Sequence, residues 1–160
     1  MNPAHAHLVL NHLPVLGTAF GFGLLLLGLW RRSNELKKTA LGVFVIIALA
    51  SVPVYLTGEP AEGVVASLPG VSQPTMEKHE EAAGVGLTGV VLLGLVALGG
   101  LFHFRGGKVL PGWFSVSVIV LALIVSALMA WVANLGGQIR HSELRAGNRP
   151  PAAAGAKSHD

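Results

Sequence analysis

Cysteine is absent from this sequence of 160 residues. Without thiols the chain can form no disulfide, ligate no iron–sulfur cluster through thiolates and attach no c-type haem. Any metal ion or haem iron that it binds must therefore be ligated by histidine, methionine or carboxylate side chains.

Charged residues are scarce as well. They make up 12% of the sequence, whereas 52% of the residues are hydrophobic, and soluble domains carry about 25% charged residues. This composition predicts a membrane protein. Four segments lack Asp, Glu, Lys and Arg over a length that suits a bilayer core, which needs about 20 helical residues. They are residues 8–30, 39–56, 82–104 and 109–139, the last of which we expect to end near Leu135.

The apolar runs are continuous rather than alternating, which favours helices over a β-barrel. We predict an all-α fold, an integral membrane four-helix bundle over residues 1–145, with a short periplasmic helix or loop between spans two and three. Glu59 before Pro60 predicts the start of that short helix, and Pro74 predicts the first turn of the third long helix. Residues 146–160, rich in Pro, Ala and Gly, are expected to be a disordered tail.

Several motifs are also missing. The sequence has no phosphate-binding glycine loop, no GxSxG and no HExxH, which excludes the common soluble enzymes that use them. The predicted spans contain no Asp or Glu, which weakens the hypothesis of a proton or cation relay through the bilayer. We therefore favour an electron-transfer or accessory subunit over an enzyme.

The net charge is +3, but the basic residues lie mainly in short loops beside the spans, so they indicate topology rather than nucleic-acid binding. By the positive-inside rule, both loops are cytoplasmic and both termini are periplasmic in a bacterial inner membrane. "MNPAHAHL" has no positive n-region, so the first span is expected to be retained. The basic residues in and beside these two loops are Arg31, Arg32, Lys37, Lys38, Arg105 and Lys108.

Histidines are frequent on the predicted periplasmic side. His5, His7, His12, His79 and His141 lie there, whereas His103 is interpreted as an interfacial residue on the cytoplasmic side and His159 belongs to the tail. These positions predict that imidazoles from several spans gather at one face.

Each of these histidines has a structural and a functional interpretation. His12 either bonds a backbone carbonyl near Pro14, where proline removes a donor, or ligates a metal or haem. His79, followed by two glutamates, either belongs to a solvated helix start or is a ligand. His5 and His7, in "HAH", are expected in an extended N-terminus and are the weakest candidates.

The end of the fourth span contains a further set of candidate site residues. Gly136 and Gly137 either end that helix or allow close approach of another element. In the structural interpretation, Arg140 and His141 complement the dipole at the helix C-terminus. In the functional interpretation, His141 is a ligand of a metal or haem iron, and Arg140 binds a carboxylate or haem propionate.

Small residues recur at helical spacing in two spans. Gly17, Gly21 and Gly28 share a stripe in the first, and Ala82, Gly86, Gly89 and Ala97 share one in the third. Close helix packing explains such stripes, although a flat cofactor would need the same space.

The segments "HLVLNHLPVLG", "YLTGEPAEGVV…LPGVS…EKHEEAA" and "NLGGQIRHSE" resemble a family of small bacterial four-span membrane proteins. The chain is similar to a broader group catalogued as a transmembrane domain of unknown function, which also occurs beside Rieske-type iron–sulfur domains. The resemblance covers residues 5–145. It implies redox work at the membrane surface, with any electron partner being another protein.

Three functional hypotheses follow. The first is a b-type haem protein that transfers electrons at the periplasmic face, with two of His12, His79 and His141 as axial ligands, the pair His12 and His79 favoured, and Arg140 near a propionate. The second is a Cu, Fe or Zn site. The third is an accessory subunit of a respiratory or photosynthetic complex. Residues considered for the metal site are His5, His7, His12, His79, His141 and Glu59.

Overall fold

The computed structural model describes residues 2–141 and residue 144, so the tail predicted over residues 146–160 lies outside the described part. Within the described residues the chain is helical and has no strand, which confirms the all-α prediction. The helices are α1 (Pro3–Leu10), α2 (His12–Trp30), α3 (Asn34–Leu56), α4 (Gly58–Val65), α5 (Gln73–His103) and α6 (Gly112–Arg140).

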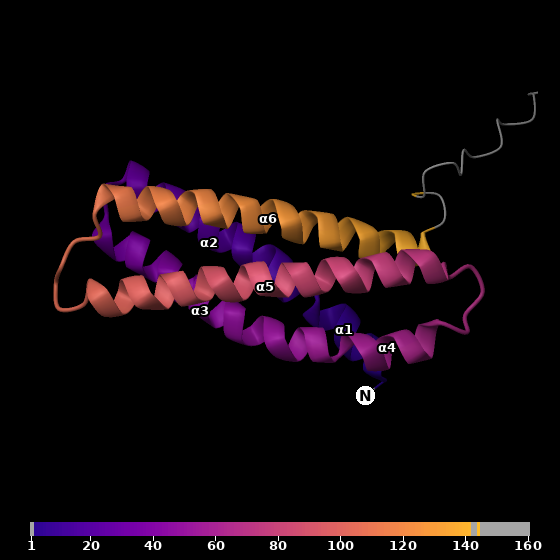
Figure 1. The fold of residues 1–160 in the computed structure, drawn as a ribbon. Coiled ribbons are helices and arrows are strands. Elements are labelled where there is room, and N and C mark those ends of the chain that lie inside the picture. The colour runs from indigo at the N-terminus through magenta and orange to yellow at the C-terminus, as the bar shows by residue number, and fades with distance from the viewer. Residues whose placement is uncertain (1, 142–143, 145–160) are drawn as a thin grey trace, which may run out of the picture.

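Four helical stretches are long and apolar enough to cross a membrane: Pro3–Trp30, Asn34–Val65, Gln73–His103 and Gly112–Arg140. They form an antiparallel bundle in which α2 and α5 each pack against both α3 and α6 (Figure 1). We call one end of the bundle the histidine end; it holds α1, α4, the first turns of α5 and the last turns of α6. The opposite end, with the loops at residues 31–33 and 104–111, is called the cationic end.

Prolines interrupt the first two spans near the histidine end. Pro14 lacks the N–H that would bond the carbonyl of Leu10, and α1 gives way to α2 at Asn11. Pro60 likewise lacks a donor, and α3 gives way to α4 at Thr57. The two short helices produced in this way, α1 and α4, pack against each other (Figure 1).

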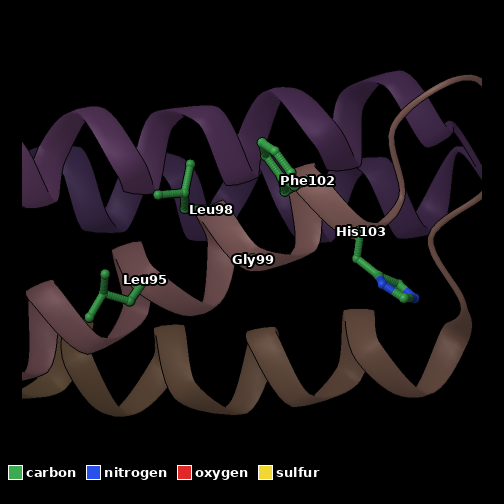
Figure 2. A pocket seen from close by; sticks show the side chains of 5 residues that line it. All are labelled: Leu95, Leu98, Gly99, Phe102 and His103. Atoms are coloured by element: carbon green, nitrogen blue, oxygen red, sulfur yellow. The ribbon is translucent and has the colours of Figure 1, made fainter.

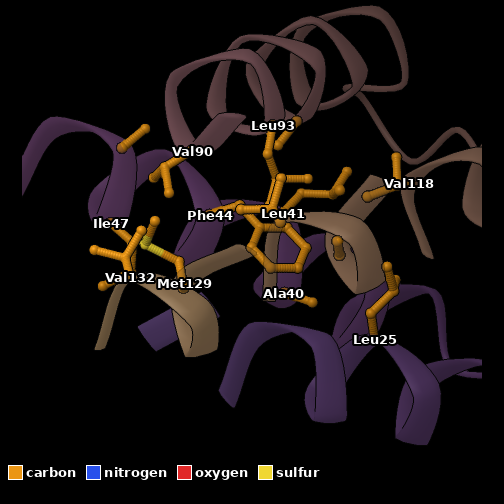
Figure 3. Close-up of a cluster of buried hydrophobic side chains, with 14 of the residues drawn as sticks. Leu25, Ala40, Leu41, Phe44, Ile47, Val90, Leu93, Val118, Met129 and Val132 are labelled. Atoms are coloured by element: carbon orange, nitrogen blue, oxygen red, sulfur yellow. The ribbon is translucent and has the colours of Figure 1, made fainter. Parts of the chain in front are cut away.

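The core of the bundle is apolar and is built by all four long helices. Leu25, Phe44, Leu93 and Val118 are among its fully buried side chains (Figure 3). Large apolar side chains also cover the outside of the bundle, and Phe20 is 64% exposed. Exposed apolar surface on every long helix suits contact with lipid, where backbone polar groups must be satisfied inside helices.

The small residues serve helix packing, as one of the two interpretations predicted. A Cβ added at Gly21 would lie 2.5 Å from Phe44 Cε1 on α3, and one added at Gly86 would clash with Met129 on α6. Helices in lipid associate largely through such close van der Waals contact. These two glycines therefore set how closely the neighbouring helices approach.

Polar side chains join the two loops at the cationic end. Asn34 Nδ2 donates to the carbonyl of Lys108 at 3.2 Å, and Asn34 Oδ1 accepts from the Leu110 N–H at 2.8 Å. Lys38 Nζ donates to the carbonyl of Phe104 at 2.7 Å, and the buried Lys37 Nζ donates to that of Leu110 at 3.2 Å. Lys37 and Lys38, which we interpreted as topology signals, therefore also join α3 to the loop between α5 and α6 at this end.

We expect the fourth span to end near Leu135, and helix α6 itself continues to Arg140. Gly136 and Gly137 do not end the helix. Glycine only permits a helix to stop, and here a side chain from α5 packs on Gly136. Pro74 lies in the first turn of α5, as predicted.

Candidate functional site

Two of the histidines are half-buried at the histidine end. They are His7 on α1 and His79 on α5. The bundle therefore places two partly buried imidazoles at one end, although their segments lie far apart in the sequence. We call them the histidine pair.

The ring of His79 is held by α6. Its Nδ1 lies 3.0 Å from the carbonyl oxygen of Val132. A carbonyl can only accept, so Nδ1 carries the proton, and in the neutral ring Nε2 carries the lone pair. The ring packs on Gly136, where an added Cβ would lie 3.1 Å from His79 Cε1. The second interpretation of this glycine, close approach of another element, is thereby confirmed.

The ring of His7 is held where α3 meets α4. Its Nδ1 lies 3.0 Å from Thr57 Oγ1, and that hydroxyl donates its own hydrogen to the carbonyl of Val54 at 2.6 Å. Because the hydroxyl hydrogen is used, Thr57 Oγ1 accepts from His7 Nδ1–H. His7 therefore has the same tautomer as His79, with the lone pair on Nε2.

His12, the residue we favoured as partner of His79, is placed differently. It is exposed on the first turn of α2, and its Nδ1 bonds the carbonyl of Leu8 at 3.0 Å. The structural interpretation predicted a bond to a backbone carbonyl, but the carbonyl is that of Leu8 and not that of Leu10, which Pro14 leaves without its usual donor. His7, rather than His12, is the half-buried histidine at the same end as His79.

The other predicted site residues lie at the same end and are exposed. Arg140 Nη1 donates to the carbonyl of Pro69 at 3.3 Å, which ties the end of α6 to the connection between α4 and α5. His141 follows the last residue of α6, Glu59 lies in the first turn of α4, and His5 lies on α1. Among residues 2–141 and 144, no three His, Asp or Glu side chains form a group suited to hold a metal ion.

The sequence interpretation missed the position of His7 and the role of Thr57. We expected "HAH" in an extended N-terminus, whereas His5 and His7 lie on α1. A signal was available, because Asn2 before Pro3 is a helix-start pattern, and the Asn2 side chain accepts from the Ala4 N–H at 3.0 Å. Thr57 carried no such local signal, since its role depends on the break between two helices.

The fold and the histidine pair define an all-helical protein with four membrane-length apolar helices and two half-buried imidazoles at one end. Compared with family models, curated proteins and solved structures, the chain gives no match.

Proposed function

We propose that this chain is a b-type haem protein of the bacterial inner membrane, and that His7 and His79 are its axial ligands. The observation that carries the proposal is the shared tautomer of the two rings. Each Nδ1–H is bonded to an oxygen, so each Nε2 lone pair is left to bind iron. Metal-ligating histidines almost always donate their other ring N–H in this way.

The number of ligands favours haem over a metal ion. Haem iron needs only two axial side chains from the protein, and a porphyrin supplies the rest. A zinc ion takes three or four ligands from the protein, and the described residues contain no group of three. The histidine pair matches the smaller requirement.

The packing around α1 supports the same conclusion. Helix α1 packs mainly against α4 and has no buried residue. Helix α1 can therefore move relative to the bundle at a lower cost than the long helices can. A haem held by His7 and His79 would lie at this end of the bundle rather than in the packed core.

Bound haem would supply one-electron chemistry, and the residues of the chain would bind and orient it. The Val132 carbonyl and the Thr57 hydroxyl hold the two imidazoles and raise their basicity as ligands. Gly136 leaves room for the His79 ring. Arg140 lies at the same end, and its guanidinium suits a propionate.

The charge asymmetry of the bundle favours a periplasmic position for this site. Six basic side chains gather at the cationic end, which we assign to the cytoplasm by the positive-inside rule. Both termini and the histidine pair then face the periplasm. Electrons would pass at that face between a quinol or periplasmic donor and a larger membrane partner.

The test is an absorption spectrum of the detergent-purified chain after expression with ample haem, recorded oxidised and then reduced. We expect a Soret band that His7→Ala and His79→Ala each abolish. His12→Ala is the matched control, since it removes an exposed imidazole at the same end and should leave the band unchanged.

Two results would overturn the proposal. One is a folded, monodisperse wild-type protein with no Soret band. The other is a band that survives loss of both His7 and His79. Elemental analysis of the same sample identifies a copper, iron or zinc site instead, and a sample with neither haem nor metal favours an accessory subunit.

A further inference from the structure

A surface depression lies on α5 in the half of the bundle nearest the cationic end. It is shallow and wide open, and it is lined by Leu95, Leu98, Gly99, Phe102 and His103 (Figure 2). Gly99 opens the depression, because no atom lies within 4 Å of the place where its Cβ would stand. The lining is apolar except at the His103 end.

A fixed cation borders the depression at the same end. The guanidinium carbon of Arg105 lies 4.4 Å from the centre of the Phe102 ring, a cation–π contact that holds the charge beside the lining. Elsewhere at this end, Lys37 and Lys38 bond the carbonyls of Leu110 and Phe104. Arg105 is therefore a basic residue placed beside the depression whose cation contacts its lining.

The length of the feature matches one leaflet of a bilayer. Residues 95–103 span about 12 Å of helix at 1.5 Å per residue, and one leaflet of the hydrocarbon core is about 15 Å thick. An acyl chain lying along the depression would thus have its headgroup level with Arg105. An apolar lining of this length suits a lipid better than a free phosphate in water.

We propose that this depression is a binding site for an anionic phospholipid of the leaflet at the cationic end. The acyl chain lies over Gly99, between Leu95, Leu98 and Phe102, and Arg105 binds the phosphate. Six basic side chains and one carboxylate, Glu35, lie at this end, so an anionic headgroup is favoured over a zwitterionic one. This inference is independent of haem binding.

The test measures which lipid the chain retains. The protein is reconstituted with equal amounts of phosphatidylglycerol and phosphatidylcholine, extracted in mild detergent and analysed by native mass spectrometry. Wild type should retain phosphatidylglycerol preferentially. Gly99→Leu fills the depression, and this variant should lose the preference for phosphatidylglycerol. Gly23→Leu is the matched control, since Gly23 also faces open space and lies on α2.

A second pair of variants tests the charge. Arg105→Gln should lower phosphatidylglycerol retention about fivefold, as expected for one basic residue at an anionic surface. Arg31→Gln is its control, because Arg31 stacks on Trp30 at 5.3 Å without bordering the depression. Soluble glycerol phosphate should not displace the bound lipid.

Equal retention of the two lipids by wild type would overturn the proposal, as would Gly99→Leu behaving like wild type. Displacement by glycerol phosphate would show an anion site without lipid and would also overturn it. If Gly99→Leu is not monodisperse, the comparison of Arg105→Gln with Arg31→Gln decides, and equal effects of these two reject the site.

Discussion

At the scale of single residues, Thr57 determines how His7 is presented. Its hydroxyl donates to the carbonyl of Val54 and accepts from His7, so one side chain between α3 and α4 fixes the tautomer of a ring on α1. Val132 does the same for His79 with a backbone carbonyl. A backbone carbonyl cannot be removed by substitution, whereas the Thr57 hydroxyl can. The hydrogen bond to His7 is therefore the one to test by mutation.

Thr57→Val should release the His7 ring, because valine keeps the shape of the side chain but neither accepts nor donates. We expect a loss of about 1 kcal/mol in unfolding free energy. The measurement is imidazole ¹⁵N NMR of the chain labelled at histidine, in which the His7 Nδ1 signal should change and that of His79 should not. Thr88→Val is the control, since Thr88 only bonds the carbonyl of Gly84 on its own helix. An unchanged His7 spectrum would contradict the assignment.

At the scale of the helix, α2 has two glycines with opposite surroundings. Gly21 faces the Phe44 ring on α3, whereas Gly23 has no atom within 4 Å of its Cβ position. The stripe that contains Gly21 could be identified from spacing in the sequence. Which neighbour it meets depends on how the helices are arranged.

Gly21→Ala should destabilise the bundle by about 1–3 kcal/mol, because the new methyl group forces the aromatic ring or the helix to move. Gly23→Ala should leave the stability unchanged or raise it slightly, because alanine favours helix. Thermal unfolding of both variants in the same detergent is the measurement. Equal midpoints for the two would show that the contact between α2 and α3 is looser than described.

At the scale of the whole molecule, the two ends of the bundle differ in chemistry. The cationic end carries six basic side chains and the histidine end carries the imidazoles. Moving such a loop of basic residues across a membrane is disfavoured, so one orientation should dominate. The absence of cysteine makes the orientation easy to test, since a single introduced cysteine is the only thiol.

Ala66→Cys, in the connection after α4, should react with a membrane-impermeant maleimide on spheroplasts. Glu35→Cys, in the first turn of α3, should react only after lysis. Both positions are exposed, and neither substitution removes a basic residue. The cysteine-free wild type is the control for background. Labelling of Glu35→Cys alone on intact spheroplasts would reverse the proposed orientation.

The sequence by itself determined the helical class and the approximate spans. The backbone polar groups of long, continuous apolar stretches are satisfied in lipid inside helices. Pro74 also identified the first turn of α5. Histidines on one side of the predicted bilayer also indicated the end of the bundle at which to look for a site. These features depend on composition and local spacing alone.

Only the tertiary structure decided which imidazoles are partly buried and what they bond. The break at Asn11 separates His7 from His12, so that one ring reaches Thr57 while the other bonds the carbonyl of Leu8. The close approach of the His79 ring to Gly136 was also decided by packing, because the two residues lie on different helices. A side chain's direction depends on which helices pack beside it, and that information lies in contacts between residues far apart in the chain.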